Sequence, residues 1–71
     1  MAKPTYHFVI TLHYRQEGAM GSLTRTLDGV FEPQRGDTRE TSFKRILTWA
    51  TEQLHARDQA VLFFALERND L

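Results

Sequence analysis

The chain has 71 residues, which is enough for one domain with a single hydrophobic core. It contains no cysteine, so disulfides and thiolate zinc sites are excluded. Nine basic residues balance nine acidic ones that are interspersed along the chain, and this neutral pattern argues against long-range attraction to nucleic acid or anionic lipid.

The apolar segments are short and favour a cytoplasmic protein. Residues 1–6 contain no apolar run of the length found in signal peptides. No apolar stretch approaches the roughly 20 residues that cross a bilayer. Together with the lack of cysteine, these features predict a cytoplasmic location and no membrane partner.

Residues 6–14 have the period-2 pattern of a half-buried strand, rich in aromatic and β-branched side chains. The more apolar side chains are expected to share one face, namely Tyr6, Phe8, Ile10, Leu12 and Tyr14. The other face is expected to carry His7, Val9, Thr11 and His13. Residues 15–21 follow with the glycines and charges of a hairpin loop.

Residues 22–32 are predicted to form a second strand that pairs with the first along its whole length. Asp28-Gly29 within it fits either a tight hairpin of its own or a β-bulge. We expect the bulge, because a hairpin there leaves only residues 30–32 before Pro33 ends the pairing.

After a turn at residues 33–36, a helix is predicted to run to about Ala56. Asp37 or Thr38 can cap it, and Glu40 stands three residues after Asp37, as in a capping box. One apolar stripe is expected to face the sheet, made of Phe43, Ile46, Leu47, Ala50 and Leu54. The opposite side, which includes Arg45, is expected to face solvent.

Residues 57–59 are predicted to be a loop, and residues 60–66 are apolar without alternation, which is typical of a strand shielded on both faces. The order strand, strand, helix, strand with a right-handed crossover predicts one α+β domain over residues 1–71. Its fold is ββαβ, with a three-stranded sheet in order 2-1-3 and one helix packed on one face.

The sheet face opposite the helix is predicted to be an interaction surface. The third strand presents either Val61 and Phe63 or Leu62, Phe64 and Leu66 there, depending on its register. Exposed apolar area of this kind marks binding surfaces, and short chains often gain stability by oligomerising. We therefore expect a homodimer or another protein on this face; the alternative is that the chain's own ends and loops cover it.

Trp49 falls at the margin of the helical stripe, between Arg45 and Gln53. A half-exposed tryptophan beside an arginine is typical of a binding hot spot. The alternative is an indole ring that packs over the sheet edge against the first or second strand. The candidate interaction residues are thus Val9, Thr11, His13, Arg45, Trp49 and Phe64.

No catalytic, metal or cofactor site is predicted, and we expect the chain not to be an enzyme. His7 and His13 stand about 20 Å apart on a strand, too far to bind one metal ion. The glycines lack the lysine of a phosphate-binding loop, and no nucleophile motif is present. An alternative function is binding single-stranded nucleic acid by stacking bases on an aromatic sheet face, although the neutral charge argues against it.

Three stretches, residues 7–12, 36–50 and 61–66, together resemble small uncharacterised proteins of high-GC Gram-positive bacteria. The resemblance spans most of the chain and rests on residues that form the fold. It implies a bacterial, cytoplasmic protein and brings no activity or functional residue with it. The function expected from the sequence is a small protein-interaction or regulatory module.

Overall fold

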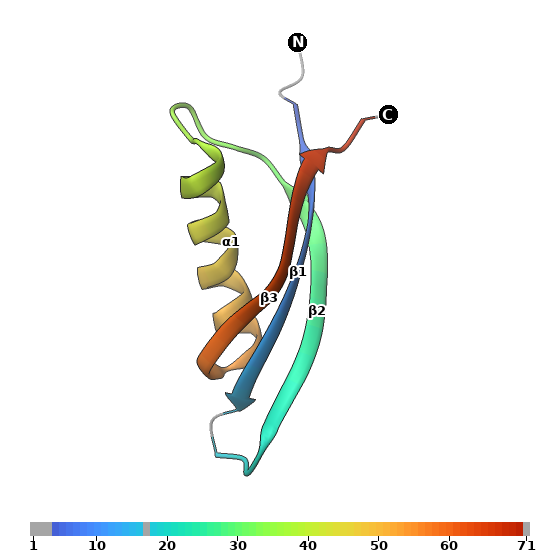
Figure 1. Cartoon of the computed structure of the whole chain (residues 1–71). Helices are drawn as coiled ribbons and strands as arrows, with labels where there is room; N and C mark the ends of the chain where they lie inside the picture. The colour runs from blue at the N-terminus through green and yellow to red at the C-terminus, as the bar shows by residue number, and fades with distance from the viewer. Residues whose placement is uncertain (1–3, 17, 71) are drawn as a thin grey trace.

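A computed structural model of the chain describes residues 4–16 and 18–70. Residues 1–3 of the segment considered for a signal peptide, and residue 17 of the predicted hairpin loop, lie outside the described residues. The elements follow in the order β1 (Tyr6–Gln16), β2 (Ser22–Phe31), α1 (Arg39–Leu54) and β3 (Ala56–Arg68) (Figure 1). The predicted ββαβ order is confirmed.

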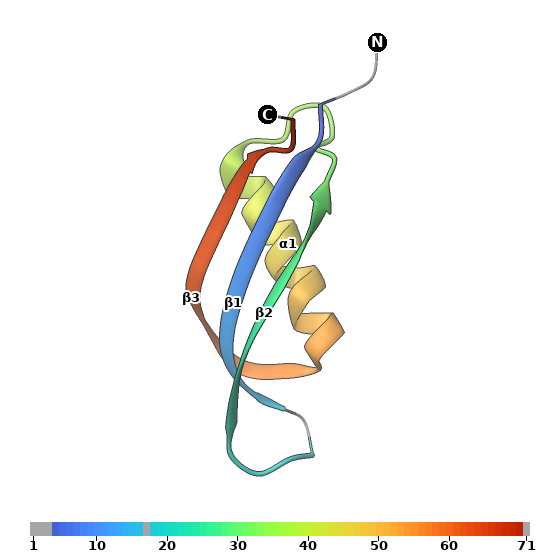
Figure 2. The same ribbon diagram turned by 90° about the vertical axis from the view of Figure 1, so that its right-hand side faces the viewer.

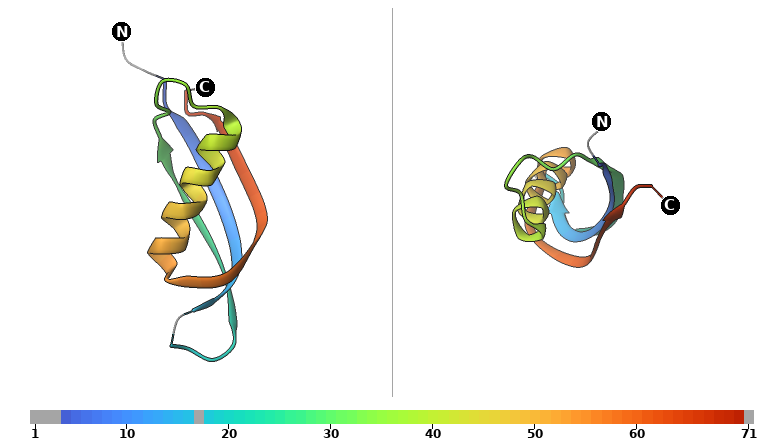
Figure 3. Two further views of the ribbon diagram at one scale, coloured as in Figure 1. Left: turned by 90° about the vertical axis from the view of Figure 1, so that its left-hand side faces the viewer. Right: turned by 90° about the horizontal axis from the view of Figure 1, so that it is seen from above.

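The three strands form one sheet in the order β2-β1-β3, as predicted, and β1 is antiparallel to both of its neighbours. Helix α1 crosses one face of this sheet diagonally (Figure 3), and the other face is open. The protein is therefore an α+β fold with an open sheet.

The core lies between the central strand β1 and α1. Alternate residues of β1 are buried against the helix, and so are two positions one turn apart on α1; the buried apolar set is Phe8, Ile10, Leu12, Tyr14, Ile46 and Ala50. The two faces predicted for β1 are confirmed. Because the apolar residues alternate on the strand and form one stripe on the helix, each element buries one side, and the chain folds into two layers.

The predicted bulge in β2 is wrong. The ladder between β1 and β2 runs without a register shift through Asp28 and Gly29, which lie opposite Val9 and Phe8. A Cβ atom on Gly29 would stand 3.1 Å from the Phe8 ring. Glycine thus lets an aromatic ring of the core pass close to its Cα, and the backbone here does not kink.

Helix α1 begins one residue later than the predicted capping box would place it. Thr38 is the N-cap: its hydroxyl accepts from the Thr41 backbone N–H at 3.2 Å, and the Thr41 hydroxyl accepts from the Thr38 N–H at 2.8 Å. Glu40 instead pairs with Lys44 on the surface. The helix ends at Leu54, before the expected Ala56, because His55 adopts a left-handed conformation with φ of 51°.

Strand β3 begins at Ala56, directly after His55, so the predicted loop at residues 57–59 belongs to the strand. Its pairing with β1 shifts register between Thr11 and Leu12 and again between His13 and Arg15. The shielding predicted for both faces of residues 60–66 is wrong, because residues 60–63 are exposed. Beyond the strand, the Asn69 backbone N–H donates to the Thr5 carbonyl at 2.9 Å.

Candidate functional site

The half of the open face formed by β1 and β2 is mainly polar and hydrogen-bonded across the two strands, and its apolar members are Val9 and Val30, which is 61% exposed. Thr11 and Thr26 share a hydrogen bond of 2.8 Å between their hydroxyls. His13 Nδ1 lies 3.0 Å from the Thr24 hydroxyl. Because these groups already have partners, they contribute little surface that calls for a ligand. Figure 2 looks onto this face with α1 behind it.

His7 completes the row, with its Nε2 3.1 Å from the Asp28 carboxylate. Val9 lies on the same face between His7 and Thr11, opposite Asp28. The candidate residues Val9, Thr11 and His13 thus share the open face, as the sequence predicts. Hydrogen bonds to Thr26 and Thr24 of β2 hold the Thr11 and His13 side chains against the sheet.

The half of the open face formed by β3 is apolar. The register sets Phe63 opposite Thr11 and Ala65 opposite Val9, so both residues share the open face with Val9. Phe63 is the one Phe, Tyr or Trp side chain on this face among residues 4–16 and 18–70.

Phe64 is a correction to the predicted site. It lies opposite Ile10 and faces the helix, with its ring 4.8 Å from that of Phe43 and nearly perpendicular to it. The Arg39 guanidinium covers the ring at 5.4 Å from its centroid. The register shift beside Leu12 decides this assignment, and shifts of one residue exchange the two faces of a strand.

Three consecutive large apolar side chains of β3 are exposed: Val61 at 37%, Leu62 at 60% and Phe63 at 54%. We call Val61–Phe63 the exposed run. Val61 lies opposite Leu12 on the helix face and Phe63 opposite Thr11 on the open face, so the strand is accessible from both sides. The sequence signal for these residues was the lack of alternation in residues 60–66, which indicates apolar side chains on both faces whether or not they are buried.

Charged residues flank the exposed run. Arg57 lies opposite Arg15, and Glu67 lies opposite His7. Both therefore belong to the open face, because odd-numbered residues of β1 point there. Neither side chain makes an ion pair within the described part of the chain.

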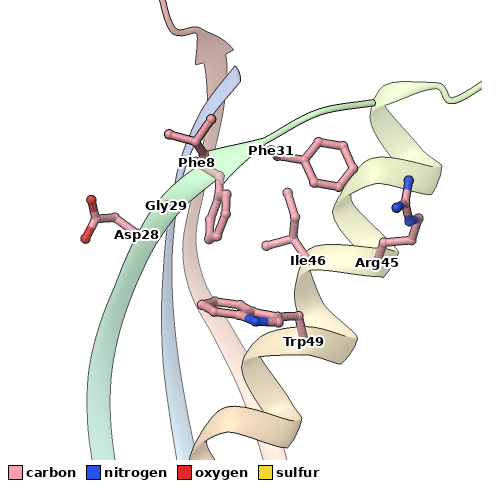
Figure 4. A pocket seen from close by; sticks show the side chains of 8 residues that line it. Phe8, Asp28, Gly29, Phe31, Arg45, Ile46 and Trp49 are labelled. Carbon is pink, nitrogen blue, oxygen red and sulfur yellow. The ribbon is translucent and has the colours of Figure 1, made fainter. Parts of the chain in front are cut away.

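A second feature is an aromatic groove of about 460 Å³ between β2 and α1 (Figure 4). Phe8, Phe31 and Trp49 line it, and Gly29 and Ile46 complete its apolar wall. The indole of Trp49 meets the Phe8 ring edge-on at 5.6 Å and is 40% exposed. Trp49 therefore packs over the sheet edge, which was the alternative to a free hot spot, while it keeps one accessible edge.

Arg45 stands at the rim of this groove and has two partners. Its guanidinium donates to the Asp37 carboxylate at 2.6 Å and covers the Phe31 ring at 4.9 Å from the centroid. The predicted solvent position is only partly correct, because Arg45 links the start of α1 to the end of β2.

The Asp37 carboxylate organises the turn before α1. It accepts from the Gln34 backbone N–H at 2.7 Å, from the Thr41 hydroxyl at 3.2 Å and from Arg45. The Gln34 N–H, followed by Thr41 and Arg45, holds the pKa of Asp37 below its ordinary value of 3.8. Only 12% of this side chain is exposed, so the carboxylate serves the fold.

Within residues 4–16 and 18–70, no three His, Asp or Glu side chains lie close enough together to hold a metal ion. Over the same residues, no helix is long and apolar enough to cross a bilayer. The chain matches no family model, no curated protein and no solved structure. The exposed run and the aromatic groove are thus the features from which a function can be argued.

Proposed function

We propose that this chain is a protein-interaction module of the bacterial cytoplasm, with the exposed run Val61–Phe63 at the centre of its docking surface. The observation that carries the proposal is the exposure of three consecutive large apolar side chains on an edge strand. Apolar side chains cost free energy in water, and an accessible cluster of them on a small domain marks a surface that a partner covers.

The two edges of the sheet differ in a way that supports β3 as the docking edge. The exposed residues of β2 are mostly polar or charged and include Thr24, Arg25, Thr26 and Asp28. The middle of β3 carries no charge from Ala60 to Leu66. An interface core is depleted in charge and enriched in aromatic residues, and β3 has this composition.

Binding of single-stranded nucleic acid receives less support. Stacking of successive bases requires several aromatic rings on one open face. Among the described residues Phe63 is the one Phe, Tyr or Trp on this face, since Tyr6, Phe8 and Tyr14 of β1 point to the helix side. The imidazoles of His7 and His13 are held by hydrogen bonds to Asp28 and Thr24. The cytoplasmic and bacterial parts of the proposal are supported by the cysteine-free composition and by the sequence resemblance.

Site-specific photocrosslinking in the producing cell tests the docking surface. A photoreactive phenylalanine in place of Phe63 should give one discrete protein adduct. The same group in place of Leu23, which is 40% exposed on β2 near the hairpin, is the matched control and should give none. A smear equal at both positions, or no adduct at Phe63, would contradict the proposal.

A further inference from the structure

We propose that the partner is a second copy of this chain, and that the β3 strands of the two copies lie antiparallel about a two-fold axis near Phe63. This inference rests on the proposed function, because it uses the same docking surface. It adds the identity of the partner and the arrangement of the two copies.

The outer edge of β3 is open to strand pairing. Among the described residues β3 pairs only with β1, so the backbone N–H and C=O groups on its other side have no strand partner. Proline and lysine are absent from Ala56–Arg68, and the features of β3 that restrict edge pairing, its two register shifts and the charges of Arg57 and Asp58, lie in its first half. The register shifts bend the first half of β3, whereas Phe63–Arg68 pairs regularly with β1 and keeps a regular edge.

The exposure pattern favours edge-to-edge pairing over a partner laid across the open face. A partner on that face would cover Phe63 and leave Val61, which points to the helix side, in water. An added strand that continues the sheet shields both faces of its neighbour. A two-fold axis perpendicular to the sheet also places both α1 helices on the same side, where they flank Val61 of each copy.

The flanking charges favour a second copy as the added strand. On the ladder with β1, Arg57 lies opposite Arg15 and Glu67 opposite His7, each four positions from Thr11, which is opposite Phe63. Both side chains belong to the open face, carry opposite charges and make no ion pair among the described residues. In an antiparallel arrangement centred at Phe63, Arg57 of each copy lies beside Glu67 of the other. The favourable pair forms twice by symmetry, whereas a parallel arrangement would place like charges together.

Sedimentation equilibrium from micromolar to millimolar concentration tests the arrangement. The unaltered chain should sediment as a monomer–dimer equilibrium. Phe63→Arg should weaken dimerisation at least about tenfold, because it introduces two charges at the axis. Leu23→Arg, at the other edge of the sheet, should leave the dimer unchanged. Far-UV circular dichroism verifies that both variants keep the fold.

A charge exchange tests the orientation of the strands. Arg57→Glu and Glu67→Arg should each weaken the dimer about tenfold, because each creates two like-charge contacts. The double variant should recover to within about threefold of the original affinity. A monomer at all concentrations, or a double variant no better than either single one, would overturn the inference. A crosslinked adduct of Phe63 with a different protein, from a chain that stays monomeric, would overturn it and leave the proposed function standing.

Discussion

Trp49 and Phe8 show how one aromatic pair closes the edge of this small core. The indole packs edge-on against the Phe8 ring, and that ring lies so close to Gly29 that a Cβ atom there would stand 3.1 Å from it. The contact between Trp49 and Phe8 links α1 to β1, and the contact between Phe8 and Gly29 links β1 to β2. They matter because α1 otherwise lies mainly over β1 and β3.

Trp49→Ala should lower the free energy of unfolding by about 2 kcal/mol, less than for a fully buried tryptophan because part of the indole is exposed. Urea unfolding of the variant measures this difference. Glu52→Ala, at an exposed position one turn further along α1, is the control and should change the stability by less than about 0.5 kcal/mol. An unchanged stability for Trp49→Ala would show that the indole serves a partner rather than the core.

At the level of the elements, the sequence predicted what short-range patterns determine. The alternation in residues 6–14 identified both faces of β1, and the helical stripe identified Ile46 and Ala50. The ends of α1 differed from the prediction by one or two residues. At the start, the capping box is formed by Thr38 and Thr41, whereas the sequence suggested Asp37 and Glu40. At the end, His55 adopts a left-handed conformation that no pattern indicates.

The candidate site was less predictable, since it depends on long-range register. The pairing of β3 with β1 slips beside Leu12, and this slip alone decides that Phe63 faces the open side while Phe64 faces the helix. An apolar run such as residues 60–66 has the same appearance in a buried central strand and in an exposed edge strand. Only the pairing order of the sheet distinguishes the two.

The turn before α1 should make the stability of the fold depend on acid pH. Because Asp37 has a lowered pKa in the folded chain, its contribution is complete above the ordinary value of 3.8 and is lost as the pH falls through the lowered pKa. Asp37→Asn should therefore lower the Tm at neutral pH. The difference from the original chain should shrink as the pH falls below 3.8.

Thermal unfolding followed by circular dichroism over a series of pH values tests this expectation. Asp58→Asn is the control, because its carboxylate makes no hydrogen bond or ion pair among the described residues. A Tm difference for Asp37→Asn that stays constant into strong acid would show that the hydrogen bonds matter and the charge does not.

At the level of the whole molecule, α1 covers only one face of the sheet formed by β1, β2 and β3 (Figure 3). The molecule is elongated, with extents of 48 × 23 × 16 Å, and the hairpin end reaches beyond the helix (Figure 1). A thin, one-sided sheet of this kind buries little surface for its length, which fits the proposal that a second copy adds to its stability.

The contact between Thr5 and Asn69 has a consequence for chain connectivity. Because it holds the first and last described segments together at one end of the sheet, a short linker between them should be tolerated. New termini opened at Gly18–Gly21, at the opposite end, would give a circular permutant in which the central strand β1 comes last. This permutant should show the far-UV circular dichroism spectrum of the parent; a disordered product would mean that the local hairpin must form first.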